Sequence, residues 1–314
     1  MKKVFIDGKA GTTGLRIYER LIERKDIELI TIPEESRKDP QARKEAIKES
    51  DITFLCLPDD AAIDAVELAR DLDTVILDAS TAHRTKEGWV YGFPELDPGQ
   101  KEGIANAKRI AVPGCHASGF IALIAPLVKS GLLPREAALS CFSLTGYSGG
   151  GKKMIGDYEA SDRPESFNAP RQYGLSQQHK HLKEMVHVTG IHHAPFFAPI
   201  VAPFYSGMEV TIPLFSDMVD ADDPIEAIKE IYKKTYNGPV VRYLDESDEN
   251  GFYSAGLYAG YDDMEISVFG NEERISLNAR YDNLGKGASG AAIQCMNLVL
   301  GVKETSGLNI KNID

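Results

Sequence analysis

The first hundred residues alternate between apolar runs and amphipathic segments. Between the runs lie segments that repeat apolar side chains at the spacing of one helix face. Strands that are apolar on both faces and alternate with helices are typical of a parallel sheet covered on both sides. This part of the chain is therefore predicted to be an α/β fold with a Rossmann-like, doubly wound parallel sheet. The predicted strands are 2–7, 27–32, 51–57 and 74–79, and the predicted helices are 13–25, 39–50 and 60–71.

The pattern changes beyond about residue 135, where longer strand-like runs replace the regular alternation. Helical periodicity remains in three segments, at residues 175–190, 223–236 and 287–301. This mixture predicts a second, α+β domain built on a mixed or antiparallel sheet. Its predicted strands are 137–146, 193–202, 207–215, 264–270 and 274–282.

Charge and composition restrict the classes of partner. The 314 residues carry a net charge of −12, with 35 basic and 47 acidic side chains and no Lys/Arg block. This argues against nucleic acid and against an anionic membrane as partners. No apolar run approaches the roughly 18 residues of a membrane helix, and the N-terminus enters a strand at once. Four scattered cysteines without a C-x-x-C pair are typical of reduced thiols, so we expect a cytoplasmic protein.

A glycine-rich turn follows the first predicted strand. Its G-x-x-G-x-x-G spacing is a variant of the dinucleotide fingerprint, in which glycines let the backbone approach a pyrophosphate at a helix N-terminus. The alternative is a plain strand-to-helix turn, but its position in the first β–α unit favours dinucleotide binding. The expected contacts are Gly8, Gly11, Thr12, Thr13 and Gly14.

The residues after the second predicted strand leave the choice of dinucleotide open. Glu34 lies about 20 residues beyond Gly14, where an acid would bind the ribose hydroxyl of NAD. Ser36, Arg37 and Lys38 could instead hold the 2′-phosphate of NADP.

Cys115 follows Pro113-Gly114 and precedes a long apolar helical run. A thiol at a helix N-terminus is stabilised as thiolate by the helix dipole, and the carboxyl end of a parallel strand is where ligands bind. A buried structural cysteine is the alternative, which the preceding turn disfavours. We predict that Cys115 is a nucleophile.

The segment HKHLKEM supplies candidates for the proton acceptor. Glu184 follows His181 by three residues and could orient it on a helix face. His179 is two residues from His181, which on a helix would splay the pair and disfavours one shared metal, so no metal is predicted. A solvated helix face is the alternative.

Two further segments are candidates for binding an anion. Ser148 and Gly149 begin a glycine-rich loop whose N–H groups could form an anion nest, with a merely flexible loop as the alternative. Ser80 and Arg84 lie at the end of another predicted strand and could supply a second contact. A dinucleotide, an activated cysteine, a base and an anion site together suggest that a thiolate attacks an acyl phosphate and that hydride reduces the resulting thioester.

These motifs resemble a known family over nearly the whole chain. VPGCHASG, YGFPEL, TGYSGGGKK, HKHLKEM and YDNLGKGASGAAIQCMNLVLG are similar to the shorter form of the N-acetyl-gamma-glutamyl-phosphate reductases. The resemblance implies NADPH-dependent reduction of N-acetyl-L-glutamyl 5-phosphate to the 5-semialdehyde, with release of inorganic phosphate, in arginine biosynthesis.

The resemblance also implies several roles and a division of the chain. Cys115 would form the thioester, and His181 or His179 would be the acid/base. Asn283, Gly285 and Gly287 would lie near the nicotinamide, and NADP would be the cofactor, held by Ser36, Arg37 and Lys38. Residues 1–117 and 284–314 would form the NADP-binding domain, residues 118–283 the catalytic and dimerisation domain, and the chain would be a homodimer or homotetramer.

Other functions compete with this one. The nearest is a semialdehyde dehydrogenase acting on aspartyl or aminoadipyl phosphate, which uses the same chemistry in a different pocket. A non-catalytic dinucleotide-binding regulator would not need Cys115. A thiol hydrolase or acyltransferase would use Cys115 and His181 without a dinucleotide.

Overall fold

Short, two-sided apolar strands build the first sheet, as their sequences predict. In a computed structural model that describes residues 1–312, six strands pair in the order β2-β1-β3-β4-β6-β5. Every pairing in this sheet is parallel. The strands are β1 (Lys2–Asp7), β2 (Ile27–Ile30), β3 (Ile52–Leu55), β4 (Val75–Asp78), β5 (Val90–Tyr91) and β6 (Arg109–Ala111).

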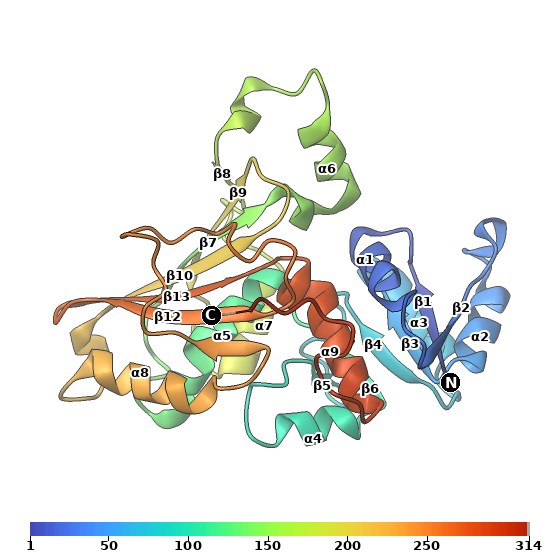
Figure 1. Ribbon diagram of the computed structural model, residues 1–314, viewed down its shortest axis with the longest axis horizontal. Coiled ribbons are helices and arrows are strands. Elements are labelled where there is room, and N and C mark those ends of the chain that lie inside the picture. The colour runs from blue at the N-terminus through green and yellow to red at the C-terminus, as the bar shows by residue number, and fades with distance from the viewer. Residues whose placement is uncertain (313–314) are drawn as a thin grey trace. The chain divides into compact units, whose positions relative to one another are not determined.

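Helices cover both faces of this sheet, so the predicted doubly wound arrangement is confirmed. On one face, α1, α9 and α4 share one apolar cluster with Val4 and Ile6 of β1, with α4 beside α9 (Figure 1). On the other, α2 and α3 pack against Phe5. The helices are α1 (Thr12–Leu21), α2 (Pro40–Glu49), α3 (Asp59–Leu68), α4 (Gln100–Ala105) and α9 (Gly290–Val299). This compact unit comprises Met1–Pro94, Pro98–Pro113 and Ala288–Leu308.

A second compact unit contains Glu95–Asp97, Gly114–Gly287 and the described residues from Asn309 onward. Its seven strands pair in the order β11-β12-β13-β10-β7-β9-β8. Antiparallel and parallel pairings both occur, so the predicted mixed sheet is confirmed. The strands are β7 (Ser140–Gly146), β8 (Arg171–Gln172), β9 (Phe196–Ala202), β10 (Met208–Phe215), β11 (Val241–Tyr243), β12 (Met264–Gly270) and β13 (Arg274–Tyr281).

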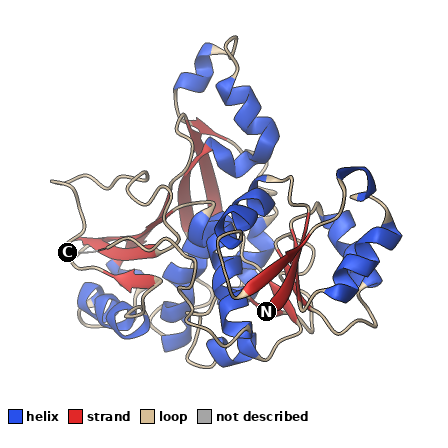
Figure 2. Cartoon of the chain, turned by 45° about the vertical axis from the view of Figure 1, so that its right-hand side comes forward, coloured by secondary structure: helices blue, strands red, loops and turns tan. Residues whose placement is uncertain are grey.

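One long helix, α5 (Cys115–Ser130), forms the centre of this second unit. Every residue from His116 to Val128 is buried, and α5 packs against α7, α8, β10 and β13. A run that is apolar all round is expected of a helix enclosed in this way. The other helices are α6 (Gly151–Glu159), α7 (His181–Thr189) and α8 (Pro224–Thr235), and α6 stands away from the sheet of its unit (Figure 2).

The structure corrects two predicted helices. The helix predicted at 175–190 begins only at His181, because Gln177 adopts a positive φ of 57° and its side-chain amide pairs with the backbone of Phe197. His179 therefore precedes the helix, and the argument that a helix would splay the two histidines is wrong. The last predicted helix begins as a π-helix, Gly285–Ser289, before α9. No helix within residues 1–312 has the length and apolar character needed to cross a membrane.

Candidate active site

The glycine turn of the first unit opens into a hollow. The turn joins β1 to α1, and the hollow has a volume of about 600 Å³. Gly8 has a φ of +86°, and a Cβ there would lie 2.3 Å from the carbonyl oxygen of Cys56, so only glycine fits. The hollow is lined by the turn from Asp7 to Gly11 and by residues that follow β2, including Glu34, Arg37 and Lys38.

The start of α1 has the features that a diphosphate needs. Its N-cap residue, Gly11, provides no side-chain hydrogen bond to the first turn. The hydroxyl of Thr12 in that turn is buried and has no hydrogen-bond partner among the described residues. First-turn N–H groups and the helix dipole together favour an anion at such an end. The residues present therefore fit a bound dinucleotide.

The residues of this hollow that follow β2 carry charges of both signs. Arg37 Nη1 lies 2.5 Å from Glu34 Oε1, and both side chains line the hollow together with Lys38. Ser36 ends the 3₁₀ turn Glu34–Ser36 that carries Glu34. The two cations can neutralise a phosphate, and Glu34 can accept a hydrogen bond from a ribose hydroxyl. The residues that would select NADP and the residue that would select NAD therefore line the same hollow.

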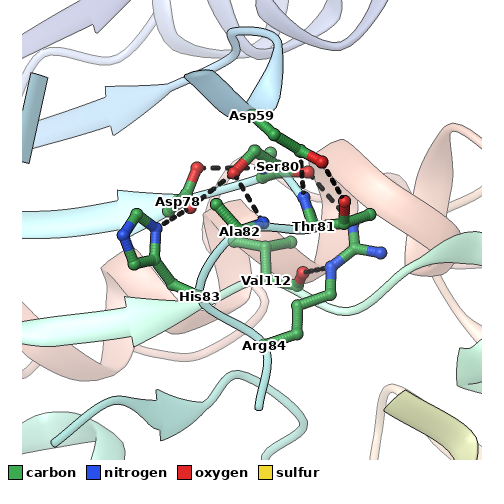
Figure 3. A network of polar contacts seen from close by, with 9 residues as sticks. Asp59, Asp78, Ser80, Thr81, Ala82, His83, Arg84 and Val112 are labelled. Atoms are coloured by element: carbon green, nitrogen blue, oxygen red, sulfur yellow. Dashed lines mark hydrogen bonds and ion pairs between the residues drawn. The ribbon is translucent and has the colours of Figure 1, made fainter. Parts of the chain in front are cut away.

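Asp78 ends β4 and organises the loop that follows it (Figure 3). Ser80 Oγ donates to Asp78 Oδ2 at 2.7 Å, and His83 Nδ1 lies 2.6 Å from the same oxygen. The His83 ring stacks on Trp89, with 4.2 Å between the centroids. Ser80 is therefore hydrogen-bonded within the protein, and its predicted anion contact stays a prediction.

Arg84 is directed at backbone carbonyls of its own unit (Figure 3). Its Nε donates to Val112 O at 2.9 Å and its Nη2 donates to Ala79 O at 3.0 Å. Charged donors make such hydrogen bonds strong. An anion at Arg84 would have to compete with these carbonyls. The bond to Val112 holds the residue that directly follows β6, three residues before Cys115.

Cys115 is the first residue of α5, directly after the N-cap residue Gly114. Its side chain is partly exposed, whereas Cys141 and Cys295 are buried. A Cβ added to Gly287 would lie 3.1 Å from Cys115 Cβ, so the π-helix lies close to residue Cys115. Cys115 thus combines accessibility with the thiolate-stabilising end of a helix.

Three histidine rings lie close together at the start of α5. Ring centroids lie 5.6 Å apart for His116 and His179, 5.6 Å for His116 and His181, and 4.8 Å for His179 and His181. The backbone N–H of His181 donates to His179 Nδ1 at 3.2 Å. His116 lies 2.6 Å from Ser143 Oγ through Nδ1 and 2.6 Å from Tyr173 OH through Nε2.

Burial keeps two of these histidines neutral. It lowers the pKa of His116 to about 3, with a further contribution from His179. It lowers the pKa of His179 to about 4, with a contribution from Lys180. Both rings are uncharged above pH 5, so neither is poised to give and take a proton near neutrality. His181 stays the predicted acid/base.

Glu184 reaches the nucleophile's helix. Its Oε1 accepts a hydrogen bond from Gly114 N at 2.8 Å, and its side chain is buried. A charge-assisted bond to an N-cap N–H fixes the direction in which α5 begins. The sequence suggested only that Glu184 orients His181, and that role stays a prediction.

The glycine-rich loop is tied to the segment after β13. Asn283 Nδ2 donates to Ser148 Oγ at 2.9 Å, and Asn283 Oδ1 accepts from Gly207 N at 3.0 Å. Gly149 is exposed beside them, and a Cβ there would lie 3.5 Å from Asn283 Nδ2. The structure therefore brings Ser148, Gly149 and Asn283 together, although the sequence placed them in separate motifs.

The π-helix that carries Gly287 is anchored by a buried ion pair. Lys286 Nζ lies 2.6 Å from Glu95 Oε2, and the two side chains are 0% and 7% exposed. Single-turn π-helices are frequent at functional sites, and this pair holds one in place.

Replacing Glu95 with glutamine should lower the free energy of unfolding by about 3–5 kcal/mol, because the buried Lys286 loses its counter-charge. Urea unfolding followed by circular dichroism would measure this. The control, Asp73→Asn, removes an exposed partner of Lys108 and should leave the midpoint unchanged. Equal midpoints for Glu95→Gln and wild type would show that the pair is not stabilising.

Two tyrosines of this site were missed from the sequence. Burial raises the pKa of Tyr173 above its usual range, and the charge of Cys115 raises it further. The same two causes raise the pKa of Tyr281. Both hydroxyls therefore lie within electrostatic range of the thiol. The only signal in the sequence was that Tyr281 begins the YDNLGKG motif.

Comparison with known proteins relates both units to one family. Residues 3–104 match the model of a semialdehyde dehydrogenase NAD-binding domain, and residues 115–283 match that of a semialdehyde dehydrogenase dimerisation domain. An N-acetyl-gamma-glutamyl-phosphate reductase 2 from Nostoc sp. is 44% identical, covering 98% of this chain and 99% of that protein. An N-acetyl-gamma-glutamyl-phosphate reductase from Chelativorans sp. is 45% identical, covering 95% of this chain and 98% of that protein.

Solved structures show the same fold at lower identity. Aspartate semialdehyde dehydrogenase from Francisella tularensis superposes with a TM-score of 0.72 at 15% identity, covering 96% of this chain and 100% of that one. The enzyme from Candida albicans, solved with NADP, gives 0.68 at 16% identity, covering 96% and 99%. The curated relatives cover nearly the whole chain at much higher identity. The chain therefore belongs to the N-acetyl-gamma-glutamyl-phosphate reductase family of the semialdehyde dehydrogenases, oxidoreductases with a nicotinamide-dinucleotide-binding domain.

Proposed function

We propose that the protein reduces N-acetyl-L-glutamyl 5-phosphate to N-acetyl-L-glutamate 5-semialdehyde with NADPH, releasing inorganic phosphate, as a step of arginine biosynthesis. The observation that carries this proposal is the partly exposed Cys115 at the first position of α5, next to the cluster of three histidines. The names of relatives that share 42–45% of their residues with this chain support the choice of substrate.

Cys115 performs the first chemical step in this mechanism. Its thiolate attacks the acyl carbon, a C–S bond forms, and the C–O bond to phosphate breaks, which leaves a thioester and inorganic phosphate. First-turn N–H groups of α5 have no acceptor inside the helix and can stabilise the oxyanion of the tetrahedral intermediate. The hydride that reduces the thioester carbon comes from the nicotinamide of bound NADPH.

His181 manages the thiol proton. It accepts the proton when the Cys115 thiolate forms and can pass it to the phosphate oxygen as the C–O bond breaks. A proton taken up from solvent then restores the thiol once the thiolate has left the reduced carbon and the aldehyde is released. Glu184 holds Gly114, so that the sulfur keeps its place at the helix start throughout. His179 accepts a hydrogen bond from the backbone of His181 and supports the start of α7.

The positive groups after β2 support NADP as the preferred cofactor. Arg37 and Lys38 line the hollow and are proposed, with Ser36, to hold the 2′-phosphate. The assignment of Asn283, Gly285 and Gly287 to the nicotinamide stays a prediction, as does the assignment of Ser148, Gly149, Ser80 and Arg84 to phosphate.

Replacing Arg37 and Lys38 together with alanine should raise KM for NADPH by roughly 10²-fold or more, because two charge-assisted contacts of roughly 1.5–3 kcal/mol each are lost. KM for NADH should change little, since NADH has no 2′-phosphate. Initial-rate kinetics with both cofactors would measure this. Arg70→Ala is the matched control, because Arg70 pairs with Glu67 three residues away, as Arg37 pairs with Glu34. An equal rise for both cofactors would contradict the assignment.

An open sheet face in the second unit supports a homo-oligomer. Phe142, Phe196 and Phe215 are 44%, 53% and 62% exposed. The register of β7, β9 and β10 puts all three on the same face, opposite to α5. Exposed aromatic side chains grouped on one sheet face are unusual for a monomer. We propose that this face joins two copies in a homodimer, which can pair further into a homotetramer.

Phe142→Asp should convert the oligomer to monomer at micromolar concentration, because it buries a carboxylate in an apolar interface. Light scattering coupled to size-exclusion chromatography gives the mass directly. Phe252→Asp, in an exposed loop, should leave the mass unchanged. A wild-type monomer, or a Phe142→Asp variant of wild-type mass, would exclude this face.

A substrate comparison tests the proposed reaction. The purified protein should oxidise N-acetylglutamate semialdehyde when both NADP and phosphate are present, followed as NADPH absorbance. Its kcat/KM for this aldehyde should exceed that for aspartate semialdehyde by at least about 10-fold. Discrimination between substrates that differ by one methylene group is usually about 10–200-fold. Preference for aspartate semialdehyde or the aminoadipate analogue would reject the proposed substrate. No turnover of any aldehyde would favour a non-catalytic regulator.

A further inference from the structure

The hydroxyl of Tyr281 bridges two backbone groups of the nucleophile's helix. Tyr281 is the last residue of β13 and is completely buried. Its hydroxyl accepts a hydrogen bond from Gly119 N at 3.0 Å and donates one to Cys115 O at 2.5 Å. One phenol oxygen therefore contacts both the residue that carries the thiol and the residue one turn further on.

The two bridged groups are the pair that an α-helix joins directly. In a regular helix, the N–H of a residue donates to the carbonyl four residues earlier, and Gly119 is four residues after Cys115. The hydroxyl therefore adds a side-chain bridge across the first turn of α5, on the same carbonyl and N–H that this turn brings together. A Cβ at Gly119 would lie 2.8 Å from this hydroxyl and 2.6 Å from Val210 Cγ2, so glycine lets the tyrosine approach.

Fixing this carbonyl also fixes the donors beside the thiol. The carbonyl of Cys115 and the N–H of His116 belong to one planar peptide group, so holding one end sets the direction of the other. First-turn N–H groups point toward the space in front of the helix, where the attacked acyl oxygen must lie. The hydroxyl of Tyr281 can therefore set both the sulfur and the oxyanion donor.

We propose that Tyr281 is a positioning residue that holds Cys115 and the Cys115–His116 peptide in the geometry needed for attack on the acyl group. The proposal rests on the proposed function only in naming the reaction; the position of the thiol can be tested without substrate. Burial and the charge of Cys115 both keep the pKa of Tyr281 well above its usual range, so the hydroxyl keeps its proton and remains a donor.

Two other tyrosines supply matched controls on the same helix. Tyr236 OH donates to Ala122 O and Tyr232 OH donates to Leu123 O, each at 2.6 Å. Pro126 has no N–H, so the carbonyl of Ala122 has no donor within the helix and depends on Tyr236. The three hydroxyls make the same kind of bond to α5, but only Tyr281 touches the turn that bears the thiol.

The experiment compares Tyr281→Phe with Tyr236→Phe. In Tyr281→Phe the first turn of α5 keeps its own backbone hydrogen bonds, so Tm should fall little. We expect kcat to fall by about 10- to 100-fold, the effect of misplacing a reacting group by about 1 Å, with KM for NADPH unchanged. The pH midpoint for alkylation of Cys115 by iodoacetamide should rise by roughly 0.3–0.7, because the N–H groups are no longer aligned on the sulfur.

Tyr236→Phe should show the opposite combination. It leaves the Ala122 carbonyl without a donor, so Tm should fall by roughly 2–10 °C, while kcat and the alkylation midpoint stay as in wild type. If Tyr281→Phe does not purify as folded protein, Gly119→Ala disturbs the same bridge from the helix side and should give the same two changes.

The proposal is overturned if the folded Tyr281 or Gly119 variant keeps the wild-type kcat and alkylation profile. It is also overturned if Tyr236→Phe loses kcat as Tyr281→Phe does, since the effect would then be general to α5. Because alkylation requires no substrate, a shifted midpoint in a protein that turns over none of the three semialdehydes would separate failure of the proposed reaction from failure of this inference.

Discussion

Cys115→Ser is expected to lower kcat by at least about 10⁴-fold while the affinity for NADPH stays the same. The physical reason is that a serine hydroxyl at a helix start remains protonated near neutrality, whereas a cysteine there is poised as thiolate. The dinucleotide hollow belongs to the other unit and keeps its lining when the sulfur is replaced. Steady-state kinetics and a fluorescence titration with NADPH would measure the two quantities separately.

Cys295→Ala is the control for loss of a thiol. Cys295 is buried in α9, where its sulfur lies 3.4 Å from Gly92 O, and it takes no part in the proposed chemistry. Its replacement should leave kcat within about twofold, the size of effect expected away from the reacting atoms. A Cys115→Ser enzyme with full turnover would exclude a covalent thioester.

The second large effect is expected at His181. His181→Asn should lower kcat by roughly 10²- to 10⁴-fold, the usual contribution of a positioned acid/base. His179→Asn should lower it by less than about tenfold, because a ring whose pKa is about 4 is a poor proton donor near neutrality. Both variants need the pH dependence of kcat/KM measured across the acid range.

The direction in which kcat/KM changes with pH distinguishes His179 from His181. A base whose pKa is lowered to about 4 is already neutral at higher pH, so a rate controlled by His179 would rise with pH only near 4. We expect His179→Asn to leave the shape of the profile intact and His181→Asn to lower kcat/KM across the measured range. A profile with an acid limb near 4 that His179→Asn abolishes would move the role to His179.

Features set by local sequence could be predicted, since they depend on neighbours along the chain. Two-sided apolar strands separated by amphipathic helices predicted the parallel sheet, and the strands from 137 to 282 predicted the mixed one. Cys115 at a helix start followed from Pro113-Gly114 and the apolar run behind it. The prediction that His179 lies in a helix was wrong. The side chain of Gln177 pairs with the backbone of Phe197, and the local sequence does not show this long-range contact.

Partners across the fold could not be predicted in the same way. Glu184 bonds to Gly114, 70 residues earlier in the chain, and Tyr281 reaches Cys115 across 166 residues. The spacing of apolar residues along the chain does not predict these hydrogen bonds, because they depend on how α5, α7 and β13 pack. The hydrogen bonds from Arg84 to Val112 O and Ala79 O were likewise not visible in the sequence, and its predicted anion contact stays a prediction. Candidate residues could be named from the sequence, whereas their hydrogen-bond partners across the fold could not.

A trapped intermediate tests the central claim most directly. The protein is mixed with N-acetylglutamyl phosphate in the absence of NADPH, quenched in acid, digested and examined by mass spectrometry. Our account predicts an N-acetylglutamyl group on the peptide that contains Cys115, lost when NADPH is added before quenching. An acyl group on another residue, or turnover with no acylated Cys115 at any time, would contradict it.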